Sequence, residues 1–179
     1  MKLSQLQRLV SRAKRDAPPK KLLEFCRHYY EPYYLFMYLA GLMVDGCLVE
    51  LGCADGRGLL ALALTGKEVY GFDLNREPEL DLEQYPNILF NLQSSLPVPD
   101  QLSDKKIGLL HLDTEHSYAQ VENEFGQYEP YLNKPAVVIF DDLHAQEDQV
   151  KQFFDELPYS KIQADDLHPS CGWGVVLYE

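Results

Sequence analysis

The chain has 179 residues, of which 46% are hydrophobic and 25% charged, and its formal net charge is −12. This length and composition fit one globular domain with a sizeable core, so we expect residues 1–179 to form a single domain. The acidic balance argues against binding of nucleic acid, which needs clustered Lys and Arg. The four cysteines show no zinc-type spacing, and no apolar leader or membrane-length apolar run is visible. We therefore expect a reduced, cytoplasmic protein without membrane contact.

Three helices are predicted in the first 44 residues. Apolar residues recur there at helical spacing, and prolines mark the breaks between the periodic segments. The predicted helices cover residues 3–15, 20–30 and 33–43. We expect residues 1–44 to form an N-terminal helical cap on an α/β core that spans 45–179.

From residue 45 onwards, short apolar runs alternate with amphipathic segments. Strands are predicted at 47–51, 68–74, 87–92, 107–112, 136–140, 161–164 and 174–178, and helices at 58–64, 117–132 and 146–157. This alternation predicts a doubly wound parallel sheet that is covered on both faces. The last two strands are joined by a turn-rich stretch without a helix, so we expect them to pair antiparallel. Ser117 and Gln120 match a capping box at the start of the longest helix.

A glycine-rich turn follows the first predicted strand. Gly52 ends the strand, and Gly56 and Gly58 open the next helix. Glycine permits positive φ there and removes the Cβ that would block a ligand lying across the backbone. The spacing is neither that of dinucleotide binders nor that of a P-loop. Glu50 and Asp55 add negative charge, which favours a cofactor with a cationic centre and no phosphate, such as S-adenosylmethionine; the alternative is an ordinary strand-to-helix turn.

Asp73 ends the second predicted strand, about 20 residues further along the chain. A carboxylate at this position can accept hydrogen bonds from both hydroxyls of a ribose. A helix cap or a solvated turn is the alternative interpretation. Together with the glycine-rich turn, Asp73 favours a nucleoside-containing cofactor.

Three further carboxylates follow neighbouring strands. Asp113 ends the fourth strand, and Asp141 and Asp142 end the fifth. Because the carboxyl ends of parallel strands meet at one edge of a sheet, we expect these groups to converge and to require a cation. Oxygen-only ligands suit Mg²⁺, and also Ca²⁺ or Mn²⁺. A solvated turn is the alternative for the Asp pair.

Histidine near neutral pH is a suitable general base, and His116 lies three residues after Asp113. We assign His116 and Asp113 as catalytic residues; the alternative for His116 is a set of local hydrogen bonds before a helix. His111 is predicted to be a core histidine with satisfied hydrogen bonds, and His144 a loop residue. We interpret Glu115, Glu122 and Glu124 as charged residues on the surface.

The segment 49–56, together with Gly71-Phe72-Asp73, resembles the class I S-adenosylmethionine-dependent methyltransferases. The resemblance covers about residues 45–179, and 172–177 are similar to the last strand of that fold. It implies a Rossmann-like, mostly parallel sheet of seven strands with an antiparallel last strand. It also implies that Gln93 and Ser94, after the third strand, approach the adenine. Ala54 departs from the family, which often has glycine there.

Two motifs are similar to those of metal-dependent O-methyltransferases. Residues 112–118 resemble the Asp-x-x-His-Ser-Tyr motif of the group that acts on sugars in natural products, and 138–142 resemble that group's strand-five motif. The catechol-type enzymes have Asn where this chain has Asp142, which favours the first group. The resemblance implies metal-assisted methylation of a small hydroxylated molecule. A bound hydroxyl would lose its proton more easily beside the metal.

Two other functions remain open from the sequence. A non-catalytic S-adenosylmethionine-binding or interaction module fits the short chain, which has no substrate-lid insertion. A nicotinamide-dependent oxidoreductase is disfavoured by the glycine spacing and the acidic turn. A group of tyrosines in the N-terminal helices could line an aromatic substrate pocket, but we expect most of them to pack against the sheet with their hydroxyls at the surface. They are Tyr29, Tyr30, Tyr33, Tyr34 and Tyr38. The Tyr-rich helix could also provide a homodimer interface.

Overall fold

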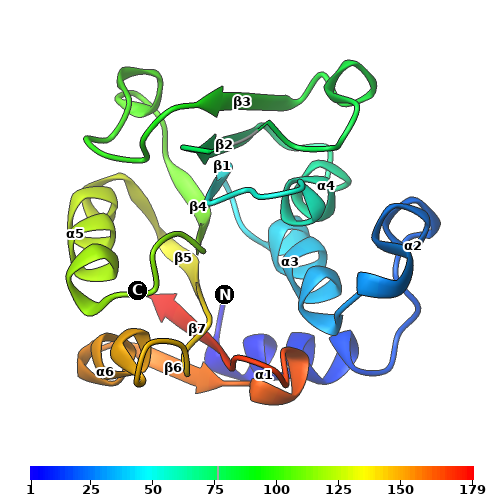
Figure 1. The fold of residues 1–179 in the computed structure, drawn as a ribbon. Coiled ribbons are helices and arrows are strands. Elements are labelled where there is room, and N and C mark those ends of the chain that lie inside the picture. Colours follow the sequence, from blue (N-terminus) through cyan, green and yellow to red (C-terminus); the bar gives the residue numbers. More distant parts are fainter. Residues whose placement is uncertain (76) are drawn as a thin grey trace.

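One mixed sheet organises the chain, of which the computed structural model describes residues 1–75 and 77–179. The sheet has seven strands in the order β3-β2-β1-β4-β5-β7-β6 (Figure 1). The strands are β1 Cys47–Leu51, β2 Val69–Asp73, β3 Ile88–Leu92, β4 Ile107–Leu112, β5 Leu132–Asp141, β6 Ser160–Gln163 and β7 Trp173–Tyr178. Neighbours among β1 to β5 pair in parallel, and β7 runs antiparallel to β5 and β6. The predicted doubly wound sheet with an antiparallel last strand is confirmed.

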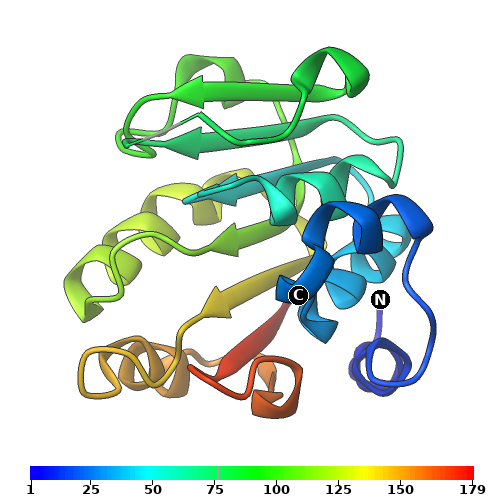
Figure 2. The ribbon, with the colours of Figure 1, turned by 45° about the vertical axis from the view of Figure 1, so that its right-hand side comes forward.

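Helices cover both faces of this sheet (Figure 2). They are α1 Leu3–Ala13, α2 Lys20–Cys26, α3 Pro32–Met43, α4 Arg57–Ala63, α5 Tyr118–Tyr128 and α6 Gln149–Glu156. On one face α3 packs against both α1 and α4, and on the other α5 packs against α6. The three N-terminal helices lie where the sequence predicts them, but α1 ends at Ala13 rather than at residue 15, and α2 ends at Cys26, after which Arg27–Tyr29 form a 3-10 turn.

Side-chain alternation along the strands decides what faces the site. In β1, Leu48 packs into the core beneath α3 and α4, whereas Val49 packs into the core beneath α5 and α6. Because side chains two residues apart share a face, Glu50 points to the α3 side. His111 is the direct partner of Glu50 in β4 and shares that side. Strand register therefore brings an acid and an imidazole together inside the protein.

Two predicted helices differ from the structure at their ends. The helix expected over 117–132 stops at Tyr128, because Pro130 has no N–H to continue it, and Glu129–Tyr131 form a 3-10 turn. The helix expected from residue 146 begins at Gln149, since residues 146–148 all have positive φ. Ser117 caps α5 as predicted: its Oγ accepts the Gln120 N–H at 3.3 Å.

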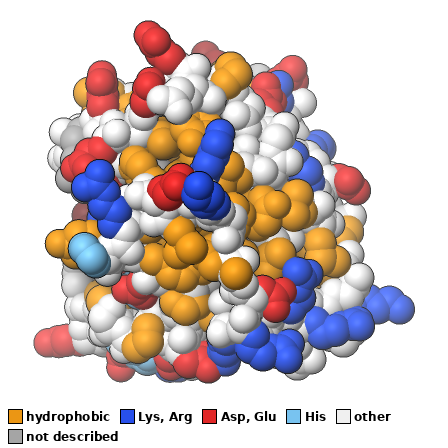
Figure 3. All heavy atoms as spheres, turned by 90° about the vertical axis from the view of Figure 1, so that its right-hand side faces the viewer, with side chains coloured by type: hydrophobic (Ala, Val, Ile, Leu, Met, Phe, Trp, Pro, Cys, Tyr) orange, Lys and Arg blue, Asp and Glu red, His pale blue; other side chains and the backbone are white. Residues whose placement is uncertain are grey.

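Apolar side chains gather on the outer face of the molecule that carries α2 and α3 (Figure 3). Leu23, Leu42 and Met43 are exposed there. Tyr33 and Tyr34 of α3 are buried instead, so these tyrosines pack inside the protein. The homodimer stays a prediction. Within residues 1–75 and 77–179, no helix combines the length and the apolar character needed to cross a membrane.

Gly52 holds the ends of β1 and β4 close together, and this generates a test. Its φ is +83°, and a Cβ would lie 1.7 Å from the carbonyl oxygen of Asp113. Gly52→Ala is therefore expected to lower the free energy of unfolding by about 3 kcal/mol, as measured by urea denaturation.

Gly126→Ala is the matched control for this substitution. Gly126 lies in α5, and a Cβ there would meet nothing within 4 Å. Alanine should raise stability at this position by about 0.5–1 kcal/mol. Equal stability of the two variants would contradict the close approach at Gly52.

Candidate active site

The glycine-rich turn packs against both the end of β2 and a buried acid. Ala54 adopts φ +45° and donates its N–H to Asp73 Oδ2 at 2.9 Å. That hydrogen bond helps to hold Ala54 in a left-handed conformation, which glycine adopts more readily than alanine. Gly56 has φ +93° and caps α4. A Cβ on Gly58 would lie 1.7 Å from Glu50 Oε1, so this glycine makes room for the Glu50 carboxylate.

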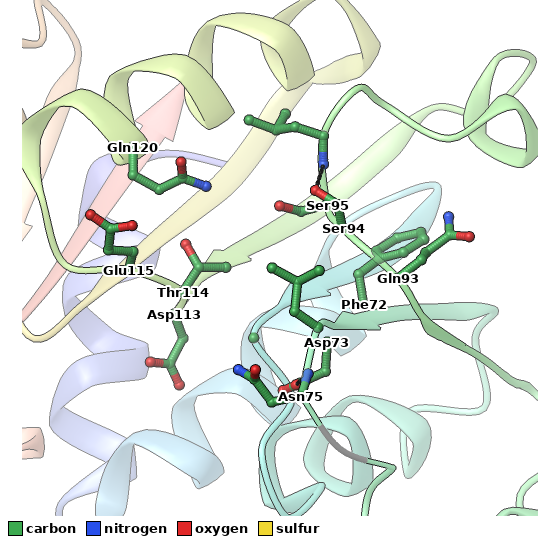
Figure 4. Close-up of a pocket in the computed structure, with 13 residues that line it drawn as sticks. Phe72, Asp73, Asn75, Gln93, Ser94, Ser95, Asp113, Thr114, Glu115 and Gln120 are labelled. Carbon is green, nitrogen blue, oxygen red and sulfur yellow. Dashed lines mark hydrogen bonds between the residues drawn. The ribbon is translucent and has the colours of Figure 1, made fainter.

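A cavity of about 480 Å³ lies at the carboxyl ends of β1, β2 and β4. Four of the predicted cofactor residues line it, namely Gly52, Asp73, Gln93 and Ser94. Figure 4 shows Asp73, Gln93 and Ser94 on one side of the cavity and Glu115 on the other. Asp73 also accepts the Asn75 N–H at 2.8 Å, which fixes the carboxylate at the cavity wall.

The remaining predicted cofactor residues lie elsewhere. Glu50 and Asp55 line a second cavity of about 230 Å³, together with Tyr33 and Tyr34. Asp113 lines both cavities and so stands where they meet. Gly56, the cap of α4, lines neither of these two cavities. Two tyrosines of α3 thus line a cavity, and their contact with a substrate stays a prediction.

Glu50 and His111 form a buried pair between β1 and β4. They are 2% and 1% exposed, respectively, and His111 Nδ1 lies 3.0 Å from Glu50 Oε1. Burial lowers the pKa of His111, but the hydrogen bond to Glu50 and nearby carboxylates outweigh it and raise the pKa to about 9. Among the described residues, His111 Nε2 has no hydrogen-bond partner. The prediction of a satisfied core histidine is right about burial and wrong about this nitrogen.

Asp113 and Asp141 converge next to this pair. One nitrogen of His111 and one oxygen of each aspartate lie within 4.8 Å of one another. Asp141 is 4% exposed, and burial, together with the charge of Asp113, raises its pKa to about 8. The buried carboxylate of Asp141 and the half-buried one of Asp113 repel each other at this spacing, so the cluster suits a bound cation.

Asp142 faces two histidines and is not grouped with Asp113 and Asp141. Its φ of +51° breaks the extended strand, and its carboxylate lies 3.1 Å from His116 Nδ1 and 3.4 Å from His168 Nε2. The hydrogen bond from His168 lowers the pKa of Asp142. Asp142 belongs to a second cluster with His168 and Cys171. Its role as a metal ligand stays a prediction.

His116 lies between Asp113 and Asp142. Its Nε2 is 3.3 Å from Asp113 Oδ1, and its Nδ1 faces Asp142. The hydrogen bond to Asp113 raises the pKa of His116. The imidazole is therefore oriented by two carboxylates, one of which lines the large cavity.

Glu124 is a residue that sequence reasoning misplaced. It is 1% exposed rather than a surface charge, and its carboxylate accepts hydrogen bonds from Ser95, Thr114 and Gln120 at 2.7, 2.8 and 3.0 Å. The helical spacing of Val121, Glu124, Phe125 and Tyr128, all buried, could have revealed it. Glu115 and Glu122 are exposed, as predicted.

His168 was missed because no local pattern marks it. It lies after β6 and its Nδ1 bonds Glu31, which precedes α3. The hydrogen bond to Asp142 and the charges of Asp141 and Glu31 overcome burial and raise the pKa of His168 to about 9. Residues so far apart in the chain meet only in the folded protein.

Comparison with known proteins places the chain in a family. Residues 49–143, just over half of the chain, match the model of a methyltransferase domain. The chain belongs to this methyltransferase family, and its fold is that of the class I S-adenosylmethionine-dependent methyltransferases. No curated protein matched the chain.

Three solved structures share this fold at low sequence identity. The O-methyltransferase TomG from Streptomyces achromogenes, in complex with S-adenosylmethionine, is 13% identical, with 99% of each chain covered and a TM-score of 0.70. CalS11, a TDP-rhamnose 3′-O-methyltransferase of calicheamicin biosynthesis, is 19% identical, with 98% of this chain and 93% of CalS11 covered and a TM-score of 0.62. An O-methyltransferase from Bacillus cereus in complex with S-adenosylhomocysteine is 12% identical, with 99% and 90% covered and a TM-score of 0.59.

Proposed function

We propose that this protein transfers the methyl group of S-adenosylmethionine to a hydroxyl oxygen of a small molecule, assisted by a divalent cation. One observation carries the proposal. Asp113 lines the large cavity beside Asp73 and also belongs to the carboxylate cluster with Asp141. A methyl donor in the cavity and a hydroxyl held at the cluster would therefore be neighbours, which is the arrangement that methyl transfer needs.

The large cavity suits S-adenosylmethionine in shape and charge. Asp73 is placed to accept ribose hydroxyls, and Gln93 and Ser94 offer polar contacts to a base. Among the described residues that line this cavity, none is Lys or Arg, whereas Asp73, Asp113 and Glu115 are acidic. This charge favours a sulfonium over a phosphate. In this proposal Glu50, Asp55 and Gly56 do not contact the cofactor directly and instead stabilise the conformation of the glycine-rich turn.

Each residue of the cluster would have a different role in methyl transfer. Asp113 and Asp141 would hold the cation, and Asp142 orients His116 through its Nδ1. When bound, a divalent cation lowers the pKa of a hydroxyl that contacts it. Neutral His116 would accept the proton of that hydroxyl on Nε2, once the contact between Nε2 and Asp113 gives way, while the oxygen takes the methyl group from the sulfonium. The sugar acceptor of CalS11 and the O-methylation by TomG support a hydroxyl as the acceptor here.

Asp73 provides a test of the cofactor site. Asp73→Ala removes the carboxylate at the cavity wall and should weaken binding of S-adenosylhomocysteine about 10- to 100-fold, as measured by calorimetry. Asp81→Ala is the control, because Asp81 Oδ1 also accepts an N–H two residues on, at 3.2 Å, but lies outside the cavity. Equal losses in both variants would contradict the assignment of Asp73.

Asp141 tests the metal-assisted reaction. Asp141→Asn keeps the shape of the side chain but removes its charge, so methyl transfer should fall at least about 100-fold. Affinity for S-adenosylhomocysteine should change less than about twofold. Turnover is followed on a panel of polyols, catechols and sugar nucleotides. Unchanged turnover would exclude the metal role, and cofactor binding without any turnover by the wild type would favour a non-catalytic binding module.

His116 tests the general base. His116→Gln should reduce kcat about 10²- to 10⁴-fold while leaving affinity for S-adenosylhomocysteine nearly unchanged. His144→Gln is the matched control, because His144 contacts Asp148 and Asp165 away from both cavities. The control should stay within about twofold of the wild type. A His116 variant with full kcat would disprove the assignment.

A further inference from the structure

The interior end of β4 carries a nitrogen that the proposed chemistry does not use. His111 is 1% exposed, and its Nε2 has no hydrogen-bond partner among the described residues. An unpaired buried polar atom costs about 1–3 kcal/mol. Such atoms are rare in folded proteins and point to an additional group that satisfies them.

Strand register places His111 on the same side of the sheet as two carboxylates. His111 and Asp113 are two residues apart at the end of β4 and face the same side. Asp141 lies two residues beyond Ile139, the partner of His111 in β5, and faces that side too. One nitrogen of His111 and one oxygen of each aspartate lie within 4.8 Å of one another. Donors about 2.0–2.2 Å from one central ion lie no more than about 4.4 Å apart, which falls inside this limit.

Glu50 determines which imidazole nitrogen is available. His111 Nδ1 lies 3.0 Å from Glu50 Oε1, so the Nδ1 proton is held by Glu50 and Nε2 is the nitrogen that a metal ion would bind in place of the second proton. A carboxylate behind an imidazole is a common way to orient a histidine that binds metal. Gly58 leaves the space that Glu50 needs. Through Gly58 and Glu50, the glycine-rich turn therefore contributes to the orientation of the His111 ring.

We propose that His111 Nε2, Asp113 and Asp141 bind a first-row divalent transition-metal ion. This inference rests on the metal-assisted function above and replaces the predicted all-oxygen ligands by a mixed nitrogen and oxygen set. Oxygen ligands suit Mg²⁺, whereas imidazole favours ions such as Co²⁺ and Zn²⁺. The protein selects Co²⁺ over Mg²⁺, and this selectivity depends on His111.

The first experiment uses Mn²⁺ as a paramagnetic probe of the wild-type protein. Electron spin-echo spectroscopy detects a nitrogen bound directly to Mn²⁺, and we expect a histidine nitrogen signal that moves when histidine is labelled with ¹⁵N. This readout requires neither substrate nor turnover. It also requires no variant, so it decides the question even if substitution of the buried His111 impairs folding.

The second experiment titrates Co²⁺ and Mg²⁺ into His111→Asn by calorimetry. Asparagine keeps an N–H for Glu50 near the position of Nδ1 and removes Nε2. Co²⁺ affinity should fall at least about tenfold, Mg²⁺ affinity should change less, and the nitrogen signal should vanish. His116→Asn is the control, since His116 also contacts Asp113; it should keep the nitrogen signal and Co²⁺ affinity within about threefold.

The outcomes separate this inference from the proposed function. A Mn²⁺ spectrum without nitrogen, in a protein whose turnover still needs Asp141, overturns the role of His111 and leaves metal-assisted transfer standing. A nitrogen signal lost in His116→Asn but kept in His111→Asn also overturns it. Wild-type protein that binds no divalent ion, with S-adenosylhomocysteine bound, overturns both and leaves a proton on Nε2 as the cation of the cluster.

Discussion

The need to balance buried negative charge at the ends of β1, β4 and β5 is the constraint on which the site depends. Glu50 and Asp141 are almost completely buried, and a buried carboxylate without a cationic neighbour costs several kcal/mol. Strand register balances part of this charge, because it places His111 directly opposite Glu50. The same pairing restricts Gly58, which has to stay small enough for the Glu50 carboxylate to fit. One charge requirement thus links the sheet, the glycine-rich turn and the cluster next to the large cavity.

The fold could be predicted well from the sequence because local signals and long-range packing agree. β1 and β4 begin and end where predicted, since each is an apolar run buried on both faces and bounded by polar or glycine residues. The errors lie where a local backbone rule outweighs periodicity. Pro130 ends α5 although the apolar spacing continues, and the positive φ values of residues 146–148 delay the start of α6. Neither feature changes the apolar pattern from which helices are predicted.

The site could be predicted in its positions but not in its contacts. Asp73, Gln93 and Ser94 meet around one cavity because each follows a parallel strand, and parallel strands end at a common edge. Adjacent residues at a strand end, such as Asp141 and Asp142, need not make the same contacts: Asp142 has a φ of +51° and contacts His116, whereas Asp141 is grouped with His111 and Asp113. Partners such as Glu31 and His168 are 137 residues apart in the chain, so no local sequence pattern indicates their contact. Side-chain direction and long-range pairing therefore had to come from the structure.

The place of β7 in the sheet has a consequence for how a newly made chain can fold on the ribosome. β7 is the last strand in the chain, yet it lies between β5 and β6, and β6 pairs with no other strand among the described residues. While residues 173–178 are still inside the exit tunnel, β5 keeps an open edge of unpaired backbone groups and β6 has nothing to join. Open apolar edges attract other chains. At this stage of synthesis, the half of the nascent protein that contains the large cavity can be ordered. The open edge of β5 and the unpaired β6 are still exposed to association with other chains.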